Sequence, residues 1–285
     1  VLGGMALDGK HFFYVNPLEV HPKSLKFNHI YDHVKPVRQR WFGCACCPPN
    51  IARVLTSLGH YIYTPHGDVL YINLYIGNSV EIPVGNAALR LRISGNYPWQ
   101  EQVKIVIDSS SPVNHTLALR LPDWCDKPQV TLNGAPVTQD VRKGYLHISH
   151  LWQEGDTLQL TLPMPVRRIY GNPLVRHQAG QVAVQRGPLV YCLEQADNGE
   201  QLHNLQLPRD ARFSTVEGKG IFARKILLQA PGYKQTAEDA ENQALWHYDR
   251  APSSRQPQVL TFIPWFSWAN RGEGEMRIWV NETEA

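Results

Sequence analysis

The feature that most constrains the fold is a series of short segments, between about residues 63 and 167, in which apolar and polar residues alternate. Three of them are Leu89–Ile93, Val103–Ile107 and Leu117–Leu121. A period of two places successive side chains on opposite faces of a strand, so each segment is expected to be a half-buried strand. Asn133-Gly134 adds a strong hairpin signal. Short strands joined by turns predict a β-sandwich over 63–167.

A second β-rich zone fills 168–285, and we predict a further β-sandwich there. We interpret its middle, Ala230–Pro257, as a long polar excursion with a short helix over Ala237–Leu245. The final strand could pair back with the first β-zone. The expected strands are Val182–Val184, Leu189–Leu193, Ile226–Gln229, Val259–Ile263 and Met276–Val280.

Residues 1–62 follow a different pattern. The segment Lys10–Val15 is aromatic and strand-like, whereas the end of this zone predicts a helix from Pro48 to Leu58, because proline suits the first turn. The zone has too few apolar residues for a core of its own, and we interpret it as loop and helix from an α-helical domain. Four apolar residues recur at the spacing of one helix face: Ile51, Val54, Leu55 and Leu58.

Three of the five cysteines lie within four positions of the stretch Trp41–Asn50, as Cys44, Cys46 and Cys47. Cys46 and Cys47 are predicted at a helix N-terminus, where backbone amides and the helix dipole favour an anion, so a thiol there tends to ionise. A thiolate is both a nucleophile and a zinc ligand. Buried packing of small apolar cysteines is the third interpretation, and the residues alone leave all three open.

Other polar residues give weaker signals. His29 and His33 are four apart, which would place them on one helix face as a metal pair, but Pro36 weakens the helix and surface histidines are commoner. Glu19 and Asp32 could each be half of a carboxylate pair, although nothing in the sequence pairs them and solvated loop charges explain them better.

Three further residues, Cys125, Cys192 and Trp152, could either take part in chemistry or pack in the interior. We expect Cys125 and Cys192 to pack in the interior, since Cys192 lies inside a predicted strand. Trp152 marks a strand entry, and stacking on a sugar is the functional alternative for it.

The charge balance excludes two classes of partner. A formal net charge of +3 over 28 basic and 25 acidic residues, without a basic run, predicts neither nucleic-acid binding nor membrane association. No apolar run is long enough to span a bilayer, and the start of the chain lacks the pattern of a signal peptide. The five cysteines are an odd number with three bunched together, which is not the pattern of a disulfide framework, so we expect a reducing, cytoplasmic setting. The start in patterned sequence without methionine suggests a piece of a longer protein.

Several motifs together resemble glycoside hydrolase family 127, whose members include β-L-arabinofuranosidases. The most specific is Gly43–Arg53, read Gly-Cys-Ala-Cys-Cys-Pro-Pro-Asn-Ile-Ala-Arg, and the resemblance extends over the whole chain. The other matching segments are Leu132–Gly134, Phe262–Gly272 and Gly274–Arg277. The resemblance implies a mainly β chain: the last segment of a catalytic (α/α)6 barrel over 1–62, then β-sandwiches over 63–167 and 168–285.

The resemblance also implies site residues. Cys46 would be the nucleophile, Cys46 and Cys47 would bind zinc, and Tyr14 would line the sugar site. Cys44 would be structural. The family's other zinc ligands, a glutamate and a cysteine, and its acid/base glutamate lie upstream, and no position of this chain matches them. The implied function is retaining release of terminal β-L-arabinofuranose from an oligosaccharide or glycoconjugate, inactive until an upstream barrel region or a partner chain completes the site.

Two other classes of function remain open. A non-catalytic carbohydrate-binding or interaction module would suit two sandwiches rich in tryptophan and an incomplete barrel with exposed apolar helix faces. A structural zinc protein would bind zinc through this chain alone and unfold with a chelator.

Overall fold

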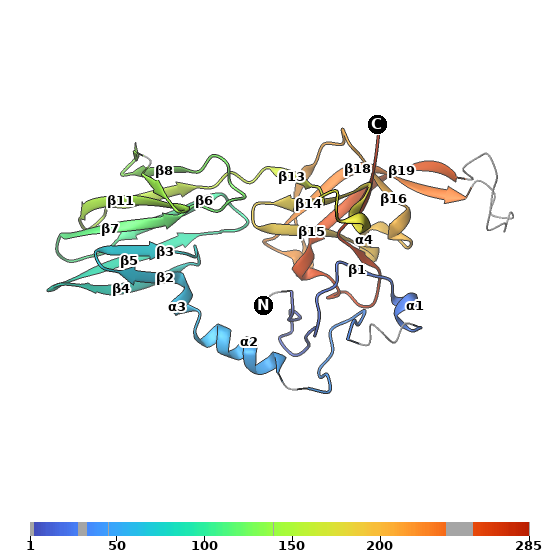
Figure 1. Cartoon of the computed structure of the whole chain (residues 1–285), viewed down its shortest axis with the longest axis horizontal. Coiled ribbons are helices and arrows are strands. Elements are labelled where there is room, and N and C mark those ends of the chain that lie inside the picture. Colours follow the sequence, from blue (N-terminus) through green and yellow to red (C-terminus); the bar gives the residue numbers. More distant parts are fainter. Residues whose placement is uncertain (1–2, 28–32, 45, 139, 238–252, 285) are drawn as a thin grey trace. The chain divides into compact units, whose positions relative to one another are not determined.

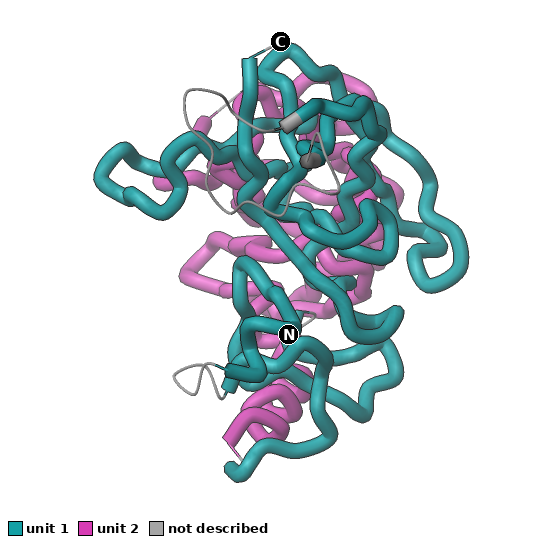
Figure 2. Tube along the Cα trace, turned by 90° about the vertical axis from the view of Figure 1, so that its right-hand side faces the viewer, with its two compact units in different colours: residues 1–45, 166–285 teal, residues 46–165 magenta. Residues whose placement is uncertain are grey.

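The computed structural model describes residues 3–27, 33–44, 46–138, 140–237 and 253–284. The chain is mainly β, as predicted, and divides into two compact units. Unit 1 comprises residues 1–45 and 166–285, and unit 2 comprises residues 46–165 (Figure 2). The predicted domain division at 62 and 167 stays a prediction, because compactness alone does not define the domains of a longer protein.

Unit 2 contains two sheets, preceded by α2 (Cys47–Thr56) and α3 (Gly59–Ile62) (Figure 1). One sheet has the strand order β10-β11-β7-β3-β2 and the other β4-β5-β6-β12-β8-β9. The strands are β2 (Tyr63–His66), β3 (Val69–Ile72), β4 (Asn78–Val84), β5 (Ala87–Gly95), β6 (Gln102–Ile107), β7 (Val113–Arg120), β8 (Gln129–Leu132), β9 (Ala135–Pro136), β10 (Val141–Arg142), β11 (Tyr145–Trp152) and β12 (Thr157–Thr161).

The alternation seen in the sequence builds the core of unit 2. Along β5, Leu89, Leu91 and Ile93 are buried while the arginines between them are exposed. Leu117 and Leu119 of β7, in the other sheet, belong to the same buried cluster. Burying a side chain of this size contributes about 1.5–3 kcal/mol, so this shared cluster is the main source of stability of unit 2.

Unit 1 is built on one ten-stranded sheet with the order β1-β20-β15-β19-β18-β16-β21-β14-β13 and β17 beside β18. Because β14 also pairs with β15, the strands β14, β15, β19, β18, β16 and β21 form a closed ring. The strands are β1 (Glu19–Val20), β13 (Val166–Ile169), β14 (Gln181–Arg186), β15 (Leu189–Glu194), β16 (Leu205–Pro208), β17 (Ser214–Glu217), β18 (Ile226–Ala237), β19 (Ser253–Pro264), β20 (Met276–Arg277) and β21 (Val280–Thr283).

The helices of unit 1 are all short. They are α1 (Pro22–Leu25), α4 (Gln195–Asn198) and the 3-10 turns η2 (Arg176–Gln178), η3 (Leu202–Asn204), η4 (Gly220–Phe222) and η5 (Trp265–Ser267). Within the part of the chain that is described, no helix is long and apolar enough to cross a membrane.

Successive residues of the ring strands enter two different cores. Tyr191 and Leu193 of β15 join one buried cluster, whereas Cys192 between them joins another, together with Phe13 and Trp268. The second cluster therefore lies on the opposite face of β15. It receives apolar side chains from residues 1–45, which gives that segment the core that it cannot form alone.

Three expectations from the sequence were wrong. Much of the supposed excursion is strand, because β18 and β19 pair in register from Leu228–Phe262 to Ala237–Ser253; most of the expected helix over 237–245 lies outside the described residues. The final strand does not return to unit 2, since β21 pairs with β14 and β16. Lys10–Val15 forms only isolated bridges, in which Phe12 pairs with Met5 and Gln39.

Candidate functional site

The helix predicted after the cysteines is α2, and its first residue is Cys47. Pro48 and Pro49 occupy the first turn, where their fixed φ favours helix initiation. The Cys46 carbonyl oxygen accepts hydrogen bonds from the Asn50 backbone N–H (3.4 Å) and from Asn50 Nδ2 (2.7 Å). Asn50 also contacts the Arg53 guanidinium. These bonds fix the backbone at Cys46 where the helix begins.

The two adjacent thiols converge at this helix start. Cys46 is exposed and Cys47 is half-buried, and their Sγ atoms lie 3.8 Å apart. A disulfide would require about 2.05 Å, so these are two separate thiols. Two sulfurs bound at about 2.3 Å to one tetrahedral zinc would also lie about 3.8 Å apart. Adjacent residues therefore reach the spacing of two zinc ligands, despite the unusual sequence separation.

The start of α2 offers an anion fewer backbone amide donors than expected from the sequence. Proline has no backbone N–H, so positions 48 and 49 give no amide donors to the first turn. Among the first three residues of α2 only Cys47 carries an N–H. An anion at Cys46 therefore has less support from backbone amides than a helix start without prolines would give.

Tyr14, the predicted sugar-site residue, belongs to an aromatic cluster in unit 1. Its half-buried ring stacks on His33 at 4.7 Å between centroids and is tilted against Phe42 at 5.6 Å. Phe42 also packs on Phe12 and forms a bridge with Cys44. Of the predicted metal pair, His29 lies outside the described residues and His33 lies against Tyr14.

A buried arginine that the sequence did not single out holds this segment in unit 1. The Arg38 Nη1 donates to the Trp268 carbonyl oxygen at 2.5 Å, and Nη2 donates to those of Gly3 and Phe266, each at 3.1 Å. The guanidinium lies over the Phe13 ring, which stacks on Trp268 at 4.7 Å. Burial lowers the pKa of Arg38 to about 10. The sequence carries no signal for this burial, because an arginine is normally exposed and the segment around it has no periodicity.

The remaining candidates have structural surroundings. Cys125 and Cys192 are buried, as predicted, and burial raises the pKa of the Cys192 thiol. Trp152 is fully buried and its Nε1 donates to the His115 carbonyl oxygen at 2.9 Å, so the idea that it stacks on a sugar is wrong. Glu19 pairs with Arg277 at 3.0 Å, and Asp32 lies outside the described residues. Over the described residues, no group of three or more His, Cys, Asp or Glu side chains forms a metal site.

Three family models account for almost the whole chain. They are the GH127 catalytic domain of β-L-arabinofuranosidase (residues 1–60), the GH127 middle domain of β-L-arabinofuranosidase (69–164) and the glycoside hydrolase family 127 C-terminal domain (166–281). The chain belongs to glycoside hydrolase family 127. Cys46 and Cys47 fall in the part matched by the family's catalytic-domain model.

Relatives within family 127 agree with this assignment. A non-reducing end β-L-arabinofuranosidase of Bifidobacterium longum subsp. longum is 36% identical over 97% of this chain and 43% of its own length. The crystal structure of a GH127 β-L-arabinofuranosidase from Geobacillus stearothermophilus T6 is 44% identical, with a TM-score of 0.92 over 99% of this chain and 44% of that one. A second solved structure, a GH127 β-arabinofuranosidase, is 31% identical with a TM-score of 0.86, again over 99% and 44%. The chain thus spans less than half the length of these relatives.

Proposed function

We propose that this chain is the C-terminal part of a retaining glycoside hydrolase that releases terminal β-L-arabinofuranose. The observation that carries the proposal is the pair of thiols at the start of α2, 3.8 Å apart, in the part matched by the family's catalytic-domain model. In this proposal residues 1–62 complete an (α/α)6 barrel and the two β-zones are β-sandwich domains. The substrate is an arabinose-containing oligosaccharide or glycoconjugate.

In the proposed reaction the exposed Cys46 thiolate attacks the anomeric carbon. A C–S bond forms as the bond to the leaving oxygen breaks, and an acid donates a proton to that oxygen. Water then attacks the same carbon and gives a proton to the conjugate base of that acid, while the C–S bond breaks and the thiolate is restored, so two inversions give net retention. The acid/base carboxylate is expected from the part of the protein that precedes this chain.

Zinc suits the donors that this chain supplies. Cys46 and Cys47 would hold it, since their sulfurs have the spacing of two ligands of one tetrahedral ion. When bound, zinc would keep both sulfurs as thiolates and orient them. Two further ligands, a glutamate and a cysteine, are expected from the preceding part. A reducing, cytoplasmic setting is proposed for the same reason, because the chemistry needs both thiols reduced.

The surface of α2 supports the proposed need for a preceding region. Val54 and Leu55 are 38% and 50% exposed, and no residue of α2 is buried. The helix was predicted from an apolar face, and in the described residues that face has little cover. We propose that helices of the upstream barrel pack on it, as on one face of any amphipathic helix.

The test uses the protein with its upstream region restored and a β-L-arabinofuranoside substrate. Cys46→Ala should abolish turnover, whereas Cys125→Ala, which removes a buried thiol elsewhere, should keep it. NMR of the first-formed sugar should show the retained anomer, and metal analysis should find zinc that is lost in Cys47→Ala. Normal turnover by Cys46→Ala, or an inverted first product, would contradict the mechanism.

A further inference from the structure

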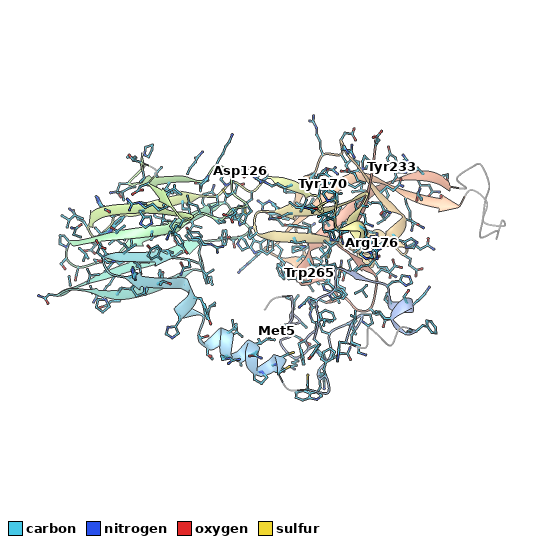
Figure 3. All side chains as sticks on the ribbon, viewed as in Figure 1. Met5, Asp126, Tyr170, Arg176, Tyr233 and Trp265 are labelled. Atoms are coloured by element: carbon cyan, nitrogen blue, oxygen red, sulfur yellow. The ribbon has the colours of Figure 1, made fainter. Side chains whose placement is uncertain are left out.

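The loop from Tyr170 to Gly180, between β13 and β14, encloses a hollow of about 220 Å³ that the proposed reaction does not use. Tyr170, which Figure 3 labels, also lines a second hollow of about 520 Å³, together with Arg168 and Phe213. All these residues belong to unit 1. The polar side chains around the first hollow are Asn172, Gln178, Gln181, Arg209 and Glu282.

The Tyr170 ring is held by its hydroxyl while the rest of the residue stays accessible. The hydroxyl donates to Glu282 Oε1 at 2.8 Å, yet the residue is 55% exposed. Glu282 is itself almost fully buried and accepts from Arg168 Nη1 and Arg209 Nε, each at 3.1 Å. Burial and the bond to Glu282 raise the pKa of Tyr170, which keeps the hydroxyl as a donor. An exposed aromatic ring fixed in this way is a pre-organised platform.

Polar groups next to this ring make the hollow more than an apolar surface. The Gln178 Oε1 atom is buried and has no hydrogen-bond partner in the described residues. A buried oxygen without a donor marks a place where water or a ligand hydroxyl could supply the missing hydrogen bond. Gly171 allows the loop to close here, because a Cβ at that position would lie 3.0 Å from Gln178 Cβ.

The chemistry of the hollow selects the class of ligand. Arg209, the one arginine among the described residues that lines the hollow, already pairs with Glu282, so the lining carries no unbalanced positive charge to favour a carboxylate or phosphate. An open aromatic face beside amide groups suits a ligand with an apolar face and a hydroxyl edge. The volume is below the roughly 300–1,000 Å³ of pockets for drug-sized ligands, so it suits a single ring.

We propose that the first hollow, of about 220 Å³ beside Tyr170, is a second saccharide-binding site. It takes one neutral sugar ring of an arabinose-containing glycan. The ring stacks on Tyr170 and its hydroxyl groups bond to Asn172, Gln178 and Gln181. The site lies apart from Cys46 in the sequence and shares no residue with the proposed reaction. The choice of an arabinose-containing glycan rests on the proposed function, whereas stacking of a sugar ring on Tyr170 does not, so sugar binding here and turnover can fail independently.

The test is titration of this 285-residue chain with L-arabinose and with an arabino-oligosaccharide, followed by amide NMR. Tyr170→Ala should weaken binding about tenfold or more, which corresponds to about 1.4 kcal/mol. Tyr170→Phe, which keeps the ring, should bind more tightly than Tyr170→Ala. Tyr61→Ala is the matched control, since Tyr61 is 57% exposed and lies outside the hollow.

Three results would overturn the proposal. The first is that neither probe binds the unaltered chain saturably, and the second is that Tyr170→Ala binds as well as the unaltered chain while its circular dichroism stays native. The third is self-association in sedimentation that Leu174→Ser abolishes, without sugar binding. Leu174 is 92% exposed in the same loop, and that result would make the loop a protein contact.

Discussion

Replacing Arg38 tests how residues 1–45 are held in unit 1. Its guanidinium donates to three backbone carbonyl oxygens, those of Gly3, Phe266 and Trp268, and covers the Phe13 ring. Arg38→Ala removes all three donors at once and opens a gap above Phe13. Asn270 Nδ2 also donates to the Trp268 carbonyl oxygen, at 3.3 Å.

The expected loss of stability in Arg38→Ala follows from the three carbonyl oxygens to which Arg38 donates. Each buried acceptor that loses its partner costs about 1–3 kcal/mol, so three could cost about 3–9 kcal/mol. Water entering the gap and the Asn270 contact recover part of this, and burial of the charge already opposes folding, as the lowered pKa of Arg38 shows. We therefore expect Arg38→Ala to cost about 3–5 kcal/mol, and Arg38→Lys less, because lysine keeps a charged donor but not the fork.

The assay is urea unfolding together with calorimetry. For a unit of 150–250 residues each kcal/mol lowers Tm by about 2–4 °C, so Arg38→Ala should lower the transition of unit 1 by about 6–20 °C. Arg40→Ala is the control, because Arg40 is exposed on the same segment and should change stability by no more than about 0.5 kcal/mol. A cost below about 1 kcal/mol for Arg38→Ala would refute the reasoning from unpaired carbonyls.

Three further predictions concern the interior. Gly232→Ala should cost about 1–3 kcal/mol in urea unfolding, because its Cβ would lie 2.6 Å from the Leu260 side chain and 2.7 Å from the Gln206 carbonyl oxygen; an unchanged midpoint would contradict this. Trp152→Phe should cost about 1–3 kcal/mol in the same assay, since the His115 carbonyl oxygen loses its donor, and a neutral result would show that water replaces it. Burial raises the pKa of Cys192, so the folded thiol keeps a proton that the unfolded chain releases above about pH 8.5; stability should fall progressively as the pH rises above about 8.5, less so in Cys192→Ala, and an equal fall in both would contradict it.

The sequence predicted most of the regular elements, because their signals are local. Leu89, Leu91 and Ile93 alternate with arginines, and a strand is the only regular structure that buries one set and exposes the other. The helix after Cys46 was signalled by proline in the first turn and apolar spacing after it. The convergence of Cys46 and Cys47 followed from the same turn.

The parts that could not be predicted depend on contacts between distant residues. Closure of the ring needs β14 to pair with both β15 and β21, and alternation says which residues are strand but not which strands meet. Arg38 lies in a segment without periodicity, and an arginine is normally exposed, so its burial had no signal. The polar residues of Ala230–Pro257 concealed long strands, because their partners are one another and not an apolar core.

The bonds from Arg38 to Phe266 and Trp268 also set an order of events during synthesis. Unit 2 is continuous in the sequence, so all of its strands have been synthesised once residue 165 is in place. Residues 1–45 are made before it, but two of the three carbonyl oxygens that hold Arg38, those of Phe266 and Trp268, and the strand β21 that closes the ring are made more than 200 residues later. Such distant contacts form slowly. The segment carrying Tyr14 therefore cannot complete its contacts within unit 1 until the last strands are translated.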